Sequence, residues 1–369
     1  MDPNAYGNTT DLTWVGGAQY IHKSDNCIFM PADLTVGLEY NEDYLRDNMW
    51  GYDRTTDQTV RIVSAYAQNE WKNDRWGILI GGRLDKHNLI KSLIFSPRAN
   101  LRYNPNENIN FRVSYSYGFR APQAFDEDLH IDNVGGTVSM IRLSDDLKVE
   151  KSQSVSLSAD MYRSWGNWQG NLLVEGFFTD LGDVFALREL GFENGILIKE
   201  RYNESGARVF GANLEGKVAY KNLLQVQMGF TAQSSKYKYA RSWGEGVEAT
   251  RKMFRTPDFH GYMTASYTPL KQLAFALTGT YTGSMLVEHH AGMIAQNTTV
   301  QTPDFWDMGF KTSYDFRVYS SFTLQLNAGV QNIFDSFQKD FDSGADRDSG
   351  YMYGPTLPRT FFFGIRLTY

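Results

Sequence analysis

The residues Arg359-Thr-Phe-Phe-Phe-Gly-Ile-Arg-Leu-Thr-Tyr369 alternate between apolar and mostly polar side chains. Successive side chains of a β-strand point to opposite faces, so this pattern predicts a strand with one apolar face. A closed membrane barrel must pair its last strand with its first, because an open edge in lipid leaves backbone groups unsatisfied. A terminal aromatic residue suits the membrane interface of such a barrel. We therefore expect a membrane-insertion strand whose lipid-facing residues are Phe361, Phe363, Ile365, Leu367 and Tyr369.

The composition is compatible with a membrane barrel. Of the 369 residues, 15% are aromatic, which suits girdles at two membrane interfaces. The mean hydropathy of -0.43 is no objection, because barrel strands turn only every second residue toward lipid. No apolar run approaches the roughly 20 residues that a transmembrane helix needs. The formal net charge of -6 gives no support to nucleic acid as a partner.

The single cysteine and the N-terminal sequence add two expectations. Cys27 has no partner, so neither a disulfide framework nor a thiolate metal site is expected. The segment Met1-Asp-Pro-Asn-Ala lacks the charged start and apolar core of a signal peptide, which an exported barrel needs. We expect the natural protein to begin upstream of Met1.

Strand-like alternation recurs along the whole chain and predicts about fifteen strands. The expected strands cover residues 12–23, 33–46, 58–72, 76–86, 94–104, 109–120, 154–161, 168–189, 197–220 (with an interruption possible), 224–232, 256–267, 273–281, 303–316, 322–330 and 359–369. Short turns are expected near 72–75, 104–107, 164–167, 220–223, 268–271 and 316–319. Long loops are expected near 46–58, 86–94, 120–150, 189–197, 239–256, 287–303 and 334–358. This rhythm is typical of outer-membrane barrels, which have short periplasmic turns and long extracellular loops. The predicted fold is all-β, a transmembrane antiparallel β-barrel; a soluble all-β protein is the alternative.

Bacterial outer-membrane barrels have even numbers of strands, whereas the pattern here gives an odd number. The first expected strand would also run toward the periplasm, which requires an earlier strand running outward. Both observations favour a fragment of a larger barrel.

Five consecutive residues at the end of one predicted strand carry a family resemblance: Gly118, Phe119, Arg120, Ala121 and Pro122. A large loop follows them. The segments 147–152 (Leu-Lys-Val-Glu-Lys-Ser), 176–180 (Gly-Phe-Phe-Thr-Asp) and 327–335 follow in order. Together with the terminal strand, they resemble TonB-dependent outer-membrane receptors, although Val149 stands where that family usually has proline.

The resemblance implies active import across the outer membrane by a barrel of about 22 strands with a plugged lumen. All of residues 1–369 are then barrel, so we expect a C-terminal portion of the β-barrel domain. The implied partners are outer-membrane lipid, a nutrient ligand in the extracellular loops, and the TonB complex through a region upstream. The expected cargo is a ferric siderophore, then cobalamin or haem, and no cofactor is expected. A passive pore without a plug is the alternative function.

The loop after Pro122 carries three carboxylates beside an imidazole: Asp126, Glu127, Asp128 and His130. These groups are candidates for contacts with a cationic or metal-bearing substrate. The alternative is a solvated loop that belongs to the fold's signature.

A second candidate is the pair His289 and His290, near Met285 and Met293 in an expected extracellular loop. Imidazole and thioether groups suit haem or a soft metal. Adjacent side chains on extended backbone point apart, however, so the two histidines are poorly placed to share one ion. A metal site is therefore not predicted.

Polar residues on the inner face of the expected strands should line a wet lumen and contact the plug: Arg112, Arg366, Gln225, Gln325 and Asn327. The aspartates at 340, 342, 346 and 348 form an acidic loop without the spacing of a twelve-residue calcium loop. No nucleophile elbow is present, and we expect no enzymatic activity.

Overall fold

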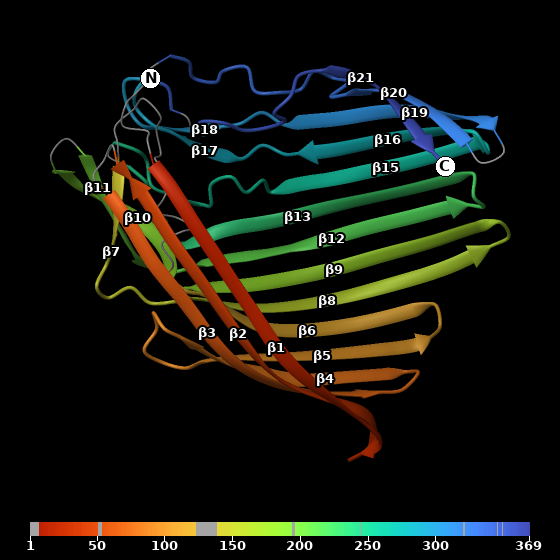
Figure 1. The fold of residues 1–369 in the computed structure, drawn as a ribbon, viewed down its shortest axis with the longest axis horizontal. Helices are drawn as coiled ribbons and strands as arrows, with labels where there is room; N and C mark the ends of the chain where they lie inside the picture. The colour runs from red at the N-terminus through yellow and green to blue at the C-terminus, as the bar shows by residue number, and fades with distance from the viewer. Residues whose placement is uncertain are drawn as a thin grey trace.

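The structure, a computed structural model, describes residues 7–50, 54–122, 139–193, 196–244, 246–319, 322–344, 346–348 and 350–369. Its main element is one curved antiparallel sheet of 16 strands, of which fifteen follow one another along a single path (Figure 1). The expectation of about fifteen antiparallel strands is confirmed. The strands of the path are β1 (Gly7–Cys27), β2 (Met30–Met49), β3 (Arg54–Lys72), β4 (Trp76–His87), β5 (Ile94–Asn106), β6 (Ile109–Arg120), β8 (Glu150–Trp165), β9 (Trp168–Gly182), β12 (Ala207–Tyr220), β13 (Leu224–Arg241), β15 (Phe259–Leu270), β16 (Leu273–Thr282), β19 (Phe305–Tyr319), β20 (Phe322–Gln331) and β21 (Thr360–Thr368). The sixteenth strand, β14 (Thr250–Lys252), pairs with β13.

The terminal strand shows how the alternating sequence produces an apolar outer face. In the ladder between β20 and β21, Leu326 lies opposite Ile365, and the next residues, Gln325 and Arg366, face each other on the other side of the sheet. Phe361 is 77% exposed and Ile365 63%, so this face has no protein covering it. The same exposure recurs on the outer face of the other strands. No helix in the described residues is long and apolar enough to cross a membrane.

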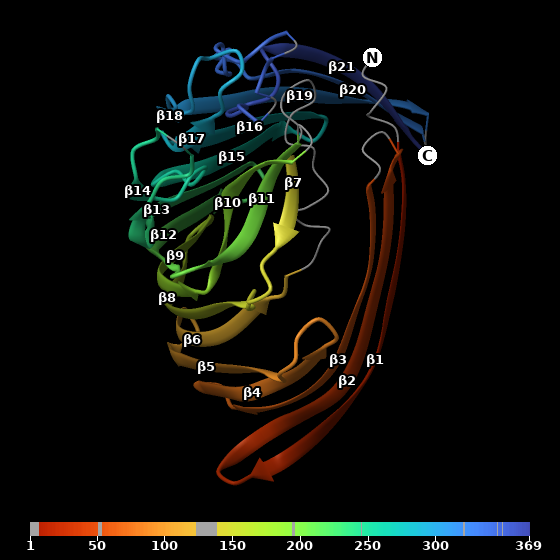
Figure 2. The same cartoon turned by 90° about the vertical axis from the view of Figure 1, so that its left-hand side faces the viewer.

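Two smaller sheets lie at one end of the main sheet, on the left in Figure 1. The first contains β10 (Val184–Glu193), β11 (Ile196–Glu204) and β7 (Ser139–Leu143), with β7 parallel to β11. The second is the pair β17 (Leu286–His289) and β18 (Thr298–Gln301). Figure 2 looks at this end and shows β7, β10 and β11 on the concave side of the curved sheet. The opposite end carries short turns (Figure 1).

Two expected long strands are each divided where the backbone turns away from the wall. The strand predicted over 168–189 ends at Gly182, and β10 begins at Val184 after Asp183, whose φ is 53°. The strand predicted over 197–220 is divided at Gly206, whose φ is 117°. A positive φ interrupts the extended backbone, so the chain leaves the ladder. A small buried core lies at this division, formed by Val184, Ala207 and Tyr237.

Other expected boundaries were also wrong. The predicted long loop at 46–58 is mostly strand, because β2 and β3 stay paired as far as Met49 and Arg54. The polar side chains of this segment do not prevent β2 and β3 from continuing as a paired hairpin beyond the apolar part of the sheet. The predicted turn at 316–319 belongs to β19, which runs to Tyr319. The expected loops at 120–150, 189–197, 239–256 and 287–303 each contain strand residues. Most of these residues belong to the two small sheets or to the short strand β14, which pairs with β13.

Candidate functional site: a cationic cavity among the loops

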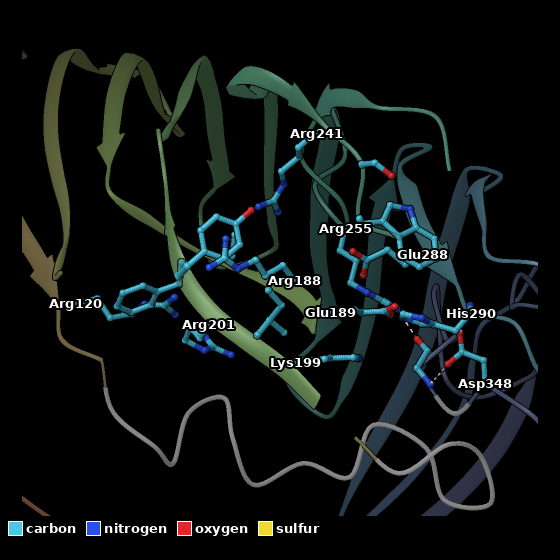
Figure 3. Close-up of a pocket in the computed structure, with 17 residues that line it drawn as sticks. Arg120, Arg188, Glu189, Lys199, Arg201, Arg241, Arg255, Glu288, His290 and Asp348 are labelled. Atoms are coloured by element: carbon cyan, nitrogen blue, oxygen red, sulfur yellow. Dashed lines mark hydrogen bonds between the residues drawn. The ribbon is translucent and has the colours of Figure 1, made fainter. Parts of the chain in front are cut away.

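A cavity of about 400 Å³ lies at the end of the sheet that carries the long loops (Figure 3). The β10–β11 hairpin, the ends of β6 and β13, β17 and the loop before β21 form its walls. Among the residues that the structure describes, three carboxylates line the cavity, Glu189, Glu288 and Asp348, and twice as many cationic side chains do so. The cations are Arg120, Arg188, Lys199, Arg201, Arg241 and Arg255. Positive charge therefore prevails among the lining residues.

Arg120, the arginine of the predicted signature, ends β6 and connects the wall to the hairpin. Its Nε donates to Glu150 Oε2 at 2.6 Å, and its guanidinium lies 4.9 Å from the centre of the Phe185 ring. The other carboxylate oxygen of Glu150 accepts a hydrogen bond from the backbone N–H of Phe185. Ala121, which follows, is buried. The signature thus places a cation in the cavity and fixes the start of β10.

The hairpin presents an arginine beside an aromatic ring. Arg188 on β10 donates to Glu200 on β11, and its guanidinium lies 4.9 Å from the centre of the Tyr202 ring. Burial, and then the hydrogen bond to Glu204, raise the pKa of Tyr202. The Tyr202 hydroxyl therefore stays protonated at neutral pH and donates to Glu204 at 2.9 Å. Arginine and aromatic side chains together can hold planar anionic groups.

Arg201 is buried near Arg120, and the two positive charges affect each other. Burial, and then the charge of Arg120, lower the pKa of Arg201 to about 10. Because this value lies above 7, Arg201 remains charged at neutral pH. An anion that entered the cavity would be attracted by both positive charges.

The remaining cationic wall comes from β13 and the segment before β15. The guanidinium of Arg241 lies 3.7 Å from the centre of the Tyr237 ring and donates to its hydroxyl. Arg255 donates to the backbone carbonyl oxygens of Met352 and Gly350, at 2.7 and 2.5 Å. Arg255 thereby connects the segment before β15 to the loop that precedes β21.

The two adjacent histidines have different surroundings. His290 lines the cavity, and its ring lies edge-on to Trp243 with 4.8 Å between the ring centroids. His289 is buried, with its Nε2 3.1 Å from both carboxylate oxygens of Asp342. Its ring stacks on Tyr351 at 3.6 Å. Only His290 of this pair lines the cavity, and a ligand contact for either histidine remains a prediction.

The other predicted candidates are the acidic residues and histidine of the loop after Pro122 and the acidic loop before β21. Asp126, Glu127, Asp128 and His130 lie outside the described residues. In the part of the chain that the structure describes, no group of three or more His, Cys, Asp and Glu residues could hold a metal ion. The acidic loop is instead internally bonded: Asp340, for example, accepts hydrogen bonds from the hydroxyls of Tyr351 and Tyr353.

Sequence reasoning missed four arginines of the cavity: Arg188, Arg201, Arg241 and Arg255. Each lies in or beside an expected long loop, more than ten residues from the next one along the chain. One available signal was the recurrence of arginine beside aromatic residues at the loop ends of strands. Spacing alone could not show that these positions converge.

Comparison with known proteins places this architecture in a family. Residues 2–333 match the family model described as TonB dependent receptor-like, beta-barrel. No curated protein sequence matches the chain.

Solved structures share the fold at low sequence identity. The ferric-catecholate import receptor Fiu from E. coli K12 has a TM-score of 0.70 and 16% identity, over 98% of this chain and 55% of its own. The siderophore receptor PirA from Pseudomonas aeruginosa has a TM-score of 0.67 and 16% identity, over 98% and 57%. The ferric enterobactin receptor PfeA from P. aeruginosa has a TM-score of 0.67 and 19% identity, over 98% and 54%.

The chain therefore spans little more than half the length of these receptors. The family match covers most of the sequence, and the fold agrees with it. The chain belongs to the TonB-dependent receptors, as a β-barrel of that family of outer-membrane transport proteins.

Proposed function

We propose that this chain is the C-terminal portion of a receptor barrel that imports an anionic ferric chelate across the outer membrane. The energy would come from the TonB complex acting through a part of the protein outside the present chain. The barrel would sit in the outer membrane, with the cavity end facing the medium. The exposed apolar outer face supports this placement, because only lipid would cover it favourably.

One observation carries the choice of cargo: six cationic side chains line a cavity that also contains Phe185, Tyr202 and Trp243. A ferric catecholate combines negative charge with aromatic rings. Arginine can donate to its oxygen atoms and stack on its rings. Fiu is named as an import receptor for ferric catecholates and PfeA as a receptor for ferric enterobactin, which agrees with this choice.

A direct test is to titrate the folded protein in detergent with trianionic ferric tris-catecholate and follow quenching of tryptophan fluorescence. Neutral ferric tris-acetohydroxamate serves as the comparison ligand, with cobalamin and haem as competitors. We expect the catecholate complex to bind and the hydroxamate complex to bind much more weakly. Equal binding of the two iron complexes, or displacement by cobalamin alone, would contradict the proposal.

Arg241→Gln should weaken catecholate binding about tenfold, because one charge-assisted hydrogen bond contributes roughly 1.5–3 kcal/mol. The matched control is Arg142→Gln. Arg142 lies on β7, in the small sheet that also contains β10 and β11, and it pairs with Glu193 at the surface. It is not among the residues that line the cavity. Similar losses in both variants would show that the effect is not specific to the cavity.

A further inference from the structure

The cationic cavity has two sides that are built from different parts of the chain. Figure 3 shows Arg120 and Arg201 on one side and Arg255, His290 and Asp348 on the other. The first side belongs to the end of β6 and to the β10–β11 hairpin. The second side brings together the segment before β15, the end of β17 and the loop before β21. Contacts between these three segments therefore decide whether the second side is assembled.

Arg255 is held in an unusual backbone conformation on this second side. Its φ is 55°, in the left-handed region that residues with a side chain rarely adopt. Such a conformation persists only where the surrounding contacts over-determine it. The backbone N–H of Arg255 donates to the carbonyl oxygen of Leu286 on β17 at 2.8 Å, and its guanidinium donates to the carbonyl oxygens of Gly350 and Met352. Arg255 is thus fixed at one end by β17 and at the other by the loop before β21.

Asp348 connects that loop to the end of β17. One of its carboxylate oxygens accepts the backbone N–H of His290 at 2.7 Å, and the other accepts the backbone N–H of Gly350 at 2.8 Å. Gly350 also supplies one of the two carbonyl oxygens that hold Arg255. The position of the Arg255 guanidinium therefore depends on where Asp348 holds the loop.

A buried pair lies behind Asp348, and neither of its members is among the described residues that line the cavity. Asp342 accepts the backbone N–H of Asp348 at 2.9 Å and the Nε2–H of His289 at 3.1 Å. The His289 ring also stacks on Tyr351. A buried carboxylate must keep its hydrogen-bond donors, because burying an unsatisfied charge is costly. The pair thus fastens the loop at 334–358 to β17.

We infer that His289 and Asp342 are positioning residues for anion binding at the cavity. They hold the loop on β17, and the loop in turn holds the guanidinium of Arg255. The inference rests on the proposed function, because it gives this pair a role in binding the anionic ferric chelate. By linkage, a ligand that contacts the assembled side of the cavity also stabilises the fastened loop.

The first measurement is the binding of trianionic ferric tris-catecholate to the folded protein in detergent, followed by tryptophan quenching. His289→Leu keeps an apolar side chain against Tyr351 but removes the donor to Asp342. If the side of the cavity is then assembled in about one molecule in ten, the apparent affinity falls about tenfold. His289→Gln restores an N–H donor, and its affinity should stay within about threefold of that of the native protein. Unchanged binding after His289→Leu would overturn the inference.

His87→Leu is the matched control. His87 is also a buried histidine at the end of a strand, but it lies on β4, far from β15 in the order of the sheet. We expect this change to leave catecholate binding unaltered. All variants are first checked for the shift in electrophoretic migration on boiling that folded membrane barrels show. Equal losses of binding after His87→Leu and His289→Leu would mean general destabilisation and would overturn the inference.

A double-mutant cycle determines whether His289 acts through Arg255. Arg255→Gln alone should weaken catecholate binding about tenfold, because a charged hydrogen-bond donor is lost. In that background His289→Leu should weaken binding by at most about twofold more, since the group that His289 positions is already absent. Fully additive losses would show that the two residues act independently and would overturn the inference.

Hydrogen exchange without ligand separates this inference from the proposed function. His289→Leu should raise the exchange rates of the Arg255 and His290 amides about tenfold, because their exchange requires opening of the same network. His87→Leu should leave both rates unchanged. An increase confined to residues 334–358 would show that the network ends within the loop, which would overturn the inference. Failure of the native protein to bind the catecholate would contradict the proposed function, whereas the exchange rates would still decide whether His289 positions Arg255.

Discussion

The apolar outer face of β20 and β21 and the cationic cavity among the loops are built on opposite principles. On the outer face, neighbouring residues of one strand alternate, as Ile365 and Arg366 do, and every second residue faces outward. In the cavity, Arg120 and Arg255 are 135 positions apart in sequence, yet both line the same space. The first region follows from local geometry, and the second depends on where distant loops meet.

This difference also determines how each region responds to change. The outer face depends on burial of apolar side chains in lipid, which is nondirectional and spread over many strands. The cavity and its supporting loops depend on specific charged and hydrogen-bonded groups. Four measurements test the contrast.

The largest effect is expected from a charge on the outer face. Ile365→Arg should destabilise the membrane-inserted protein by about 2–4 kcal/mol, because arginine near the bilayer midplane is costly. The control is Gln325→Arg, which places the same residue on the inner face near Asp315, the present hydrogen-bond partner of Gln325. Denaturant unfolding in lipid vesicles measures both. Equal destabilisation would show that the two faces do not differ as described.

The next effect concerns the buried contact between His289 at the end of β17 and Asp342 in the loop at 334–358. Asp342→Ala should leave the N–H of Asp348 without its present acceptor and remove the partner of His289. Each buried group left unsatisfied costs about 1–3 kcal/mol, so the loop at 334–358 should open more often. Trypsin cleavage at Lys339 or Arg347 should become faster. Asp346→Ala, an exposed aspartate of the same loop, should leave the cleavage rate unchanged.

Ionic strength should separate the cavity from the outer face. Raising salt from about 0.05 M to 0.5 M shortens the Debye length to a few ångströms and should weaken ferric catecholate binding several-fold. Membrane-inserted stability should change little over the same range, because apolar burial does not depend on charge. Salt-independent binding of the catecholate complex would argue against recognition by the cationic cavity.

The smallest effect is expected from pH at Asp340. Burial acts to raise its pKa, but hydrogen bonds from Tyr353 and Tyr351 outweigh burial and hold the pKa below the ordinary 3.8. The carboxylate therefore stabilises the loop above pH 3.8, and this contribution is lost as the pH falls through the lowered pKa. Tyr353→Phe should move that loss to higher pH.

Hydrogen exchange of the loop at 334–358 across a pH series measures this shift. The control is Tyr239→Phe, because Tyr239 is exposed and lies near the same end of the sheet. The measured quantity is the midpoint of the pH dependence of loop exchange. A midpoint that moved equally in both variants, or that did not move after Tyr353→Phe, would contradict the assigned role of the Tyr353 hydroxyl.

The accuracy of prediction differed between the same two regions. The strand at 359–369 was predicted almost to the residue, because alternation with a period of two is a local property of extended backbone. The strand predicted over 168–189 was wrong only after Gly182, where β9 ends. Residues 184–187 are all apolar, so the sequence remains strand-like past Asp183, while the positive φ at Asp183 directs the chain into the β10–β11 hairpin.

The sequence by itself therefore determined the all-β class, the order of the strands along the chain, the outward face of strands such as 359–369, and the family. These properties depend on periodicity and on short motifs such as Gly118–Pro122. Only the tertiary structure decided that Arg188, Arg201, Arg241 and Arg255 meet Arg120 around one cavity, and that His290 lines it while His289 does not. The reason is physical: loop convergence is set by strand pairing across the whole sheet, whereas each strand's faces are set by its own backbone.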